Sequence, residues 1–521
     1  MVAISDKSEE IVETGIASNN DASVKVKKKK YSLKAQAGYL FAGKMIAFFV
    51  QFLIPVIFVR FFSKEGYGLY RKVMLMNMFL LPILEFGFVN SLYYFYPNAK
   101  EKAKQLLSQT FFLCLATGIV FLCVFFTFKA QMLPLVEGKG MIKYIYPAGL
   151  LVFFMLVSTM LDDIFVLERR SKLVLMSLVI NDVSRALVIV ISVILSHKIS
   201  AVIWSLVGFS AARSVFLFTY LKLKYGINLN FKTWDKKYFF SHLNYAIPLG
   251  MSRAVAEVGR RMDQFIVSVF CSAADFAVYS IAKFNIPIVN MIYYAVGNVV
   301  LQQLSRYNYD DNQEEVRKLW HKMIENFAII TVPMVTYFIV MANPIVTFLY
   351  TDEYAESANI YRISLLILFT QMLGRGTIMR ASEETKTMFK INLFTMIVGI
   401  VLGYLGVKTF GLMGAATASV FTFYVNAFLQ VLQSKRILGL KFSNVMPWKN
   451  LGRIVLASVI PAIMIYPLLF VKWPKIVVLA LSCVIYAVVL AFLYEKWEIT
   501  QVLPKIKEFA VKKGLMRAGA A

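Results

Sequence analysis

The sequence predicts an all-α integral membrane protein with about fourteen transmembrane helices. Hydrophobic residues make up 59% of its 521 residues, charged residues only 17%, and the mean hydropathy is +0.65. Soluble domains average roughly 45–50% apolar and 25% charged residues. In addition, apolar runs of about 18 or more residues recur along the chain, and each is long enough to cross a hydrocarbon core of about 30 Å as a helix.

Fourteen apolar runs define the predicted spans. The first is too long for the apolar region of a signal peptide and has no small-residue cleavage site after it, so we expect it to remain in the protein. The predicted spans are 37–61, 69–95, 106–128, 144–162, 173–195, 201–221, 239–269, 277–303, 319–342, 359–379, 391–407, 412–433, 452–471 and 476–494. Because their number is even, both ends of the chain are expected on the same side of the membrane.

The distribution of Lys and Arg predicts which side that is. The tails and loops on the side of the termini carry about four times as many of these residues as the opposite loops, and cytoplasmic loops carry the excess in membrane proteins. We therefore expect both termini in the cytoplasm. This explains most of the net charge of +26. Nucleic-acid binding would need a soluble basic module with interleaved aromatic residues, which the sequence lacks.

Motifs for metal, cofactor or covalent chemistry are not found in the sequence. The four cysteines lack the paired spacing of a metal site or a disulfide framework, and the three histidines are scattered near span ends or in loops. There is no phosphate-cradling glycine loop and no His-Glu-x-x-His sequence. The longest outer loop, 129–143, contains a single acidic residue, Glu137. We therefore expect a protein that is not an enzyme and that holds neither a metal nor a cofactor.

A short internal repeat indicates how the spans are organised. The segment 62–70, between spans 1 and 2, has a counterpart at 271–279, between spans 7 and 8. A serine (Ser63 and Ser272) and a tyrosine are kept at equivalent positions, and aromatic and small residues are exchanged conservatively. Because the repeat recurs after six spans, it predicts two six-helix lobes followed by two extra helices.

The predicted organisation has six parts. They are a disordered basic cytoplasmic tail (1–36), an N-lobe with spans 1–6 (37–222), a cytoplasmic inter-lobe loop (223–238), a C-lobe with spans 7–12 (239–435), spans 13 and 14 (436–494), and an amphipathic basic tail on the inner leaflet (495–521).

Several motifs, in order along the chain, resemble a known family. They are the run 58–70, Glu85-Phe86-Gly87, Ile247-Pro248-Leu249-Gly250, Arg261-Met262-Asp263, Tyr279-Ser280-Ile281-Ala282, Phe348-Leu349-Tyr350 with Glu353-Tyr354, and Gly411-Leu412-Met413-Gly414-Ala415-Ala416. Their order and spacing resemble the polysaccharide flippases of the O-antigen type, which are part of the multidrug/oligosaccharidyl-lipid/polysaccharide exporter superfamily. Arg71 and Lys72 depart from the family's pattern. They either snorkel to the outer surface, which we favour, or contact substrate at the exit.

The resemblance implies both a shape and a function. The shape is two pseudo-symmetric helical bundles in a V around a central cavity. The function is to move an undecaprenyl-diphosphate-linked oligosaccharide from the cytoplasmic to the outer leaflet by alternating access. The implied partners are this lipid-linked glycan and the membrane lipids, together with the glycosyltransferases and the polymerase of a surface polysaccharide.

Span 7 carries the densest set of charged residues inside the membrane. Its polar residues on one helical face are Arg253, Glu257, Arg260 or Arg261, and Gln264. Asp263 lies three residues from Arg260 and can pair with it. An ionisable residue inside a span costs about 2.5–3.5 kcal/mol on insertion scales, so its retention needs a reason. We favour a polar stripe that lines a water-filled cavity over a set of internal ion pairs.

Residues of other spans extend this predicted cavity. The predicted substrate-binding residues are Lys44, Arg253, Arg260, Arg261, Lys283, Asn290 and Arg375, and the predicted coupling residues or charge partners are Glu85, Glu257 and Asp263. Arg362 adds a further positive charge. Such a basic interior attracts a diphosphate, to which Arg offers two parallel hydrogen bonds. Glu85 can be a protonatable coupling group or the partner of an Arg. In span 5, Asp182 and Arg185 are expected to form a structural pair.

Other functions stay open beside the flippase. A lipid II-type flippase or a drug or ion antiporter of the same superfamily would share the fold, although a basic cavity disfavours a cationic drug. A membrane-embedded polysaccharide polymerase is less favoured, because such enzymes generally carry a sizeable catalytic loop outside the membrane.

Overall fold

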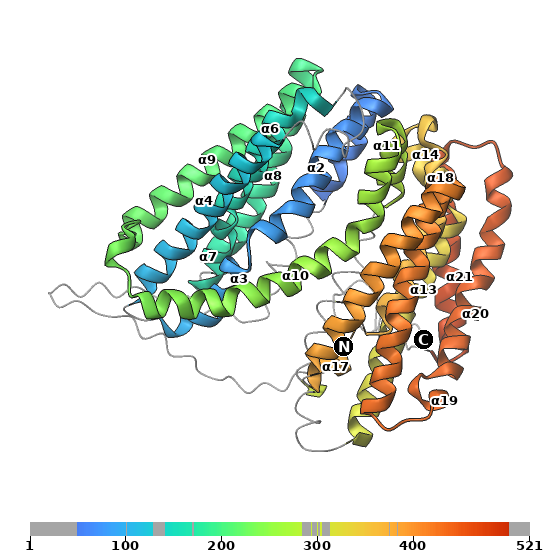
Figure 1. Cartoon of the computed structure of the whole chain (residues 1–521). Coiled ribbons are helices and arrows are strands. Elements are labelled where there is room, and N and C mark those ends of the chain that lie inside the picture. Colours follow the sequence, from blue (N-terminus) through green and yellow to red (C-terminus); the bar gives the residue numbers. More distant parts are fainter. Residues whose placement is uncertain are drawn as a thin grey trace, which may run out of the picture.

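The computed structural model describes residues 49–99, 102–128, 141–168, 171–283, 313–374, 376–382 and 384–499, and the single positions 293, 300, 303 and 304. All regular structure within these residues is helical (Figure 1). A helix over Phe49–Phe61 comes first. The labelled α-helices that follow are α2 (Lys64–Leu84), α3 (Phe88–Phe95), α4 (Ala103–Thr127), α6 (Ile145–Ser158), α7 (Met160–Leu167), α8 (Ser171–Ser196), α9 (Ile199–Tyr225), α10 (Lys236–Phe270), α11 (Ala273–Ala282), α13 (Gln313–Val340), α14 (Ala342–Tyr350), α15 (Ser357–Leu365), α16 (Ile367–Met372), α17 (Thr377–Ala381), α18 (Thr385–Ile437), α19 (Phe442–Val445), α20 (Trp448–Ile465) and α21 (Lys475–Lys496).

The helices confirm a multi-pass membrane protein. In the described part of the chain, 8 helices are long and apolar enough to cross a membrane, or 9 if the bent pair α2 and α3 counts as one span. α10 is longer than most of them, with 35 residues, but too polar to qualify by the same measure. The described parts of the predicted spans are mainly helical. Their number, fourteen, remains a prediction, because 1–48 and most of 284–312 lie outside the described residues.

The helices form two groups with a middle layer between them (Figure 1). The first group contains α4, α6, α7, α8 and α9, and the second contains α13, α14, α18, α20 and α21. α2 and α11 lie between the two groups, and α10 runs from the start of α4 in the first group to α18 in the second. This arrangement agrees with the expected V of two bundles, while the lobe boundaries at 37–222 and 239–435 remain predictions.

The second predicted span is broken rather than straight. α2 and α3 are bent by 48° relative to each other, and the connecting residues Phe86 (φ 46°) and Gly87 (φ 73°) adopt left-handed backbone conformations. α10 passes this break so closely that a Cβ atom on Gly250 would lie 2.1 Å from the carbonyl carbon of Phe86. Only glycine fits such a backbone contact. Two motifs that are far apart in the sequence therefore meet at one point.

The internal repeat corresponds to two equivalent helix starts. Ser63 is the N-cap of α2, where its Oγ accepts a hydrogen bond from the backbone N–H of Gly66 at 3.3 Å. Ser272 is the N-cap of α11, where its Oγ accepts from the backbone N–H of Asp275 at 3.1 Å. A serine at the N-cap gives a partner to an amide that the helix itself leaves without one. The repeated serine is thus a helix-start signal used twice.

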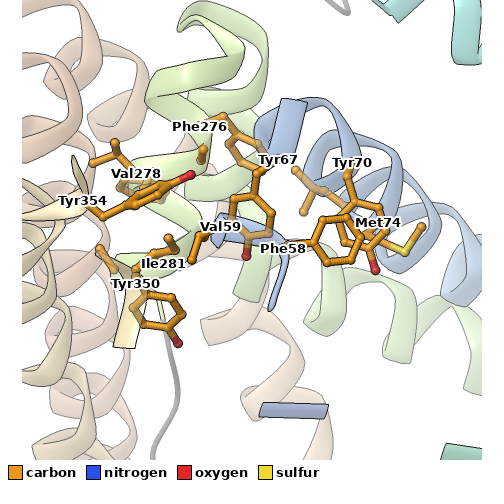
Figure 2. Close-up of a cluster of buried hydrophobic side chains, with 14 of the residues drawn as sticks. Phe58, Val59, Tyr67, Tyr70, Met74, Phe276, Val278, Ile281, Tyr350 and Tyr354 are labelled. Atoms are coloured by element: carbon orange, nitrogen blue, oxygen red, sulfur yellow. The ribbon is translucent and has the colours of Figure 1, made fainter. Parts of the chain in front are cut away.

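The two helices that begin at these serines pack against each other at the centre of the molecule (Figure 2). Tyr67 of α2 and Phe276 of α11 are fully buried, beside Tyr350 and Tyr354 from α14 and the turn that follows it. The close approach depends on Gly68, because a Cβ atom there would lie 1.7 Å from the carbonyl oxygen of Ala273.

Gly68→Val should therefore destabilise the protein, because the added side chain forces α2 and α11 apart. Overpacking typically costs about 1–3 kcal/mol, and an atom directed at a backbone carbonyl cannot be relieved by a change of rotamer. The measurement is the melting temperature of the full chain in detergent, beside its level in the membrane. Gly208→Val is the matched control, because Gly208 also lies inside a helix but has no neighbouring atom within 4 Å of an added Cβ. Equal melting temperatures for the two variants would contradict this prediction.

α18 is a helical hairpin rather than one helix. Gly411 has non-helical dihedral angles (φ 57°, ψ −137°), and the two arms that meet there run back along each other. A Cβ atom on Gly406 would lie 2.6 Å from the carbonyl oxygen of Gly414. Further from the tip, Asn426 Nδ2 lies 3.1 Å from Asn392 Oδ1. The arms correspond to the predicted spans 391–407 and 412–433.

Candidate functional site

The candidate site is organised by α10, whose first turn is fixed at the start of α4. Asp235 is the N-cap, and its Oδ1 accepts a hydrogen bond from the backbone N–H of Tyr238 at 3.2 Å. Lys102 Nζ lies 2.8 Å from Asp235 Oδ2, and this hydrogen bond holds the pKa of the carboxyl below its usual range. Gln105 Nε2 donates to the Asp235 carbonyl oxygen at 3.1 Å.

A buried histidine fixes the next turns of α10. The side chain of His242 is fully buried, with Nε2 2.5 Å from Ser91 Oγ and Nδ1 2.9 Å from Gln109 Nε2. These contacts join α10 to α3 and α4. His242 is therefore a structural residue near the start of the predicted span 239–269.

A first cavity, of about 220 Å³, lies between α10 and the break that separates α2 from α3. Its charged lining residues are Glu85, Arg253, Glu257 and Arg261. Asn90 Nδ2 donates to Glu85 Oε1 at 2.6 Å across the helix break, and Arg261 Nε lies 4.0 Å from Glu257 Oε2. With two acids and two arginines in its lining, the first cavity has no excess of positive charge.

A second cavity, of about 290 Å³, lies between α10 and α18 and differs in its chemistry. Arg260 of α10 and Arg380 of α17 line it, and no carboxylate is found among its described lining residues. The remaining polar lining consists of Tyr293, the amides Asn392, Asn426 and Gln430, and the hydroxyls Thr370, Thr395 and Thr422. Arg260 also contacts Glu257 one turn away on the same helix. The second cavity is thus basic and rich in groups that hydrogen-bond without charge.

The polar stripe of span 7 therefore serves two cavities instead of one. Arg253, Glu257 and Arg261 line the first cavity, and Arg260 lines the second. Adjacent residues on a helix lie about 100° apart, so Arg260 and Arg261 cannot face the same side. Of the two alternatives for the predicted face, Arg261 lies with Arg253 and Glu257 in the first cavity, whereas Arg260 faces the second.

The predicted pairing of Arg260 with Asp263 is wrong. Asp263 is buried, and its Oδ2 lies 2.5 Å from Lys283 Nζ and accepts a hydrogen bond from the Tyr279 hydroxyl at 2.8 Å. Lys283 Nζ in turn donates to Ser419 Oγ at 3.2 Å. Lys283 lines neither the first nor the second cavity and forms a buried ion pair with Asp263, so its place among the substrate-binding residues remains a prediction.

Other predicted residues also take different places. Asp182 and Arg185 form no ion pair within the described residues, and Arg185 Nη2 lies 3.8 Å from Met74 Sδ. Arg362 Nε donates to the Ile339 carbonyl oxygen at 3.1 Å and lines neither cavity. Lys44, Asn290 and Arg375 lie outside the described residues.

The favoured interpretation, that Lys72 snorkels to the outer surface, is wrong. Its side chain is only 2% exposed, and Nζ donates to the carbonyl oxygen of Cys271 at the end of α10 at 3.2 Å. Arg71 Nε is buried as well. Lys72 therefore belongs to the packed contact between α2 and α10.

Most of the polar lining of the second cavity is absent from the prediction, including Arg380, Asn392, Asn426 and Gln430. Arg380 directly follows the predicted span 359–379, so the sequence places it in a cytoplasmic loop. The available signal for the others was the spacing of Asn426 and Gln430, which lie four residues apart in an apolar span and hence on one face.

The fold and the two polar cavities define a multi-pass helical membrane protein with ionisable residues directed inward, the architecture of a transporter. Residues 57–359, more than half of the chain, match the family described as polysaccharide biosynthesis protein. The chain belongs to this family. The resemblance drawn from the sequence motifs is thereby confirmed.

Similar proteins agree with this assignment. The chain is 21% identical over 386 residues to the capsular polysaccharide biosynthesis protein CapF of Staphylococcus aureus, covering 73% of this chain and 93% of that protein. It is 19% identical over 204 residues to the probable low-salt glycan biosynthesis flippase Agl15 of Haloferax volcanii, covering 38% and 43% of the two chains. The fold is similar to that of the lipid II flippase MurJ in an inward closed conformation, with a TM-score of 0.71, 17% identity, and coverage of 89% of this chain and 99% of that chain.

Proposed function

We propose that the chain flips a polyprenyl-diphosphate-linked oligosaccharide, a surface polysaccharide repeat unit, from the cytoplasmic to the outer leaflet by alternating access. The observation that carries the proposal is the second cavity, which has two arginines, no carboxylate among its described lining residues, and a wall of amides and hydroxyls. Membership of the polysaccharide biosynthesis family supports it, as does the similarity to a protein named as a glycan biosynthesis flippase.

The chemistry of the second cavity fits the two polar parts of such a substrate. A diphosphate is doubly anionic, and a guanidinium group can donate two parallel hydrogen bonds to it. Sugars carry many hydroxyls, and the uncharged amide and hydroxyl groups of the wall match them. The polyprenyl tail would stay in the lipid while the head group crosses between the two helix groups.

The same chemistry separates the alternatives. A cationic drug would be repelled by Arg260 and Arg380, so an antiporter for cations is disfavoured. Lipid II also has a diphosphate and sugars and would fit the cavity, but the family match points to polysaccharide repeat units. A polymerase would generally carry a sizeable catalytic loop outside the membrane, and the longest predicted outer loop, 129–143, is short. We therefore propose a transporter rather than an enzyme.

The remaining parts of the proposal concern location and partners. We propose that the protein lies in the bacterial inner membrane with both termini in the cytoplasm. Glycosyltransferases on the cytoplasmic side would supply the lipid-linked glycan, and a polymerase on the outer face would receive it after transport. The lobes would rock about α10, with Glu85 and Glu257 as charge partners of the arginines in the first cavity.

The test is transport by the purified full chain in liposomes. The probe is an undecaprenyl-diphosphate oligosaccharide with a fluorescent label on its sugar, and dithionite, which does not cross the bilayer, destroys the label on the outer leaflet. Empty liposomes should retain the fluorescence of the inner leaflet, whereas liposomes with the chain should lose it, with or without an imposed proton or sodium gradient. Retention of the inner-leaflet fluorescence under every gradient, with the chain correctly folded, would refute the proposed function.

A further inference from the structure

One wall of the second cavity is a chain of hydrogen-bonded side chains on the two arms of α18. Asn426 Nδ2 donates to Asn392 Oδ1 at 3.1 Å and to Thr395 Oγ1 at 2.9 Å. Gln430 Nε2 donates to Asn426 Oδ1 at 2.8 Å. All four side chains line the cavity. We call these four residues the amide chain.

The direction of the amide chain follows from Thr395. Its hydroxyl donates to the carbonyl oxygen of Ile391 at 2.9 Å, as expected for a threonine inside a helix, so its oxygen is left to accept from an amide N–H of Asn426. The amide oxygen of Asn426 must then face Gln430, and Gln430 must present Nε2 to it. The oxygen Oε1 of Gln430 is consequently the end of the chain.

Gln430 Oε1 is a buried acceptor that lacks a donor. The residue is only 7% exposed, and among the described residues no side chain or backbone group donates to this oxygen. A Cβ atom on Gly376 would lie 3.4 Å from it, so the start of the helix that carries Arg380 passes beside this oxygen. Buried polar atoms are almost always hydrogen-bonded, but this oxygen lacks an O–H or N–H donor in the described part of the chain; an occupant of the second cavity would supply one once the Gln430 side chain turns toward it.

We propose that the amide chain is the sugar-recognition subsite of the flippase, in which Gln430 Oε1 accepts a hydrogen bond from a hydroxyl or acetamido N–H group of the glycan. The proposal rests on the proposed function and adds to it a division of labour. Arg260 and Arg380 attract the diphosphate, and the amide chain distinguishes lipids by the sugar that they carry.

Charge and hydrogen-bonding capacity favour a sugar over other occupants at Gln430. The phosphates of a diphosphate diester are ionised at neutral pH and offer acceptors only, so they cannot satisfy an amide oxygen. A metal cation could bind an amide oxygen, but two arginines and no carboxylate among the described lining residues make the cavity unfavourable for it. A site built to bond a hydroxyl also rejects a ligand that lacks it, because its own polar atom is then left unpaired.

The test compares three lipids on the full-length protein in detergent micelles by native mass spectrometry. They are undecaprenyl diphosphate without a sugar, the same lipid with N-acetylglucosamine, and the same lipid with galactose. The wild type should bind at least one of the sugar-bearing lipids about tenfold more tightly than the bare lipid. Gln430→Met, which keeps the volume but removes the amide, should abolish this preference.

The matched control is Gln371→Met. Gln371 on α16 is likewise buried, and its Oε1 likewise has no donor among the described residues, but it does not line the second cavity. Its variant should keep the wild-type preference, and the paired change Arg260→Gln with Arg380→Gln should weaken all three lipids alike. A wild type that binds the three lipids equally, or a Gln430→Met variant that keeps the preference, would overturn the subsite but not the flippase. A wild type that binds none of them would overturn both.

Discussion

Liposomes that contain the variant Arg260→Gln with Arg380→Gln should flip the labelled oligosaccharide lipid about 100-fold more slowly than wild-type liposomes. A hydrogen bond to a charged group is worth about 1.5–3 kcal/mol, so the loss of one such contact from each arginine removes more than the roughly 2.8 kcal/mol that correspond to this factor. Glutamine keeps a polar side chain in the second cavity, so the change removes charge and little else. The measurement is the rate at which the fluorescence of the inner leaflet, initially protected from dithionite, is lost, divided by the amount of folded protein.

The level of this double variant in the membrane should remain normal. Glu257, the partner of Arg260 in an ion pair, keeps Arg261 at 4.0 Å, so no carboxylate is stranded. Lysine at both positions, Arg260→Lys with Arg380→Lys, should give a transport rate between those of the double glutamine variant and the wild type, because lysine lacks the planar fork that binds two oxygens at once. As a control, Arg253→Gln removes a charge from the first cavity, where Glu85 then loses a nearby cation. Its effect should be mainly on protein level, and a double variant with normal transport would end the role of the second cavity.

The membrane-spanning helices and the polar character of span 7 could be predicted because both are properties of a single segment. Hydropathy identifies an apolar run, and the charges at 253, 257, 260 and 261 on one long helix are visible as a periodic pattern. The repeated serine at 63 and 272 likewise acts on the helix that it begins. Each of these signals depends on residues within about one or two helical turns of one another.

The errors share a different origin, since they concern contacts between segments. The spacing of Arg260 and Asp263 allows a pair within α10, but Lys283 of the next helix, α11, takes Asp263. Helix packing decides between two such partners, and one sequence does not show which helices touch. The second cavity was missed for the same reason. Asn392 and Asn426 become one group only when α18 folds back at Gly411.

Charge also directed the prediction toward arginines and lysines and away from amides. Arginines and lysines inside a span stand out because they are costly there, whereas an amide is cheaper and draws less attention. Gln430 therefore escaped notice, although it lies four residues from Asn426 on the same helical face. Conversely, Lys283 stood out by its charge but is occupied by Asp263 and Ser419.

Lys283→Met should strongly reduce the stability of the protein, because it leaves the carboxylate of Asp263 buried without its cation. The two groups lie 2.5 Å apart, with side chains 10% and 9% exposed. Removing one partner of a buried ion pair typically costs about 3–5 kcal/mol. The melting temperature in detergent and the level in the membrane should both fall, and Asp263→Leu should have a similar effect because it strands the lysine.

The double variant Asp263→Leu with Lys283→Met separates a structural role of Lys283 from a substrate contact. Replacing a buried ion pair by apolar side chains of similar volume is often neutral or stabilising, so stability and level should return close to those of the wild type. Transport should return with them, since neither residue lines the first or the second cavity. If instead Lys283→Met keeps a normal level and melting temperature but loses transport, and the double variant does not recover it, Lys283 contacts the substrate. Lys283 would then pair with Asp263 in one conformation of the protein and enter the transport path in another, when the helices rearrange.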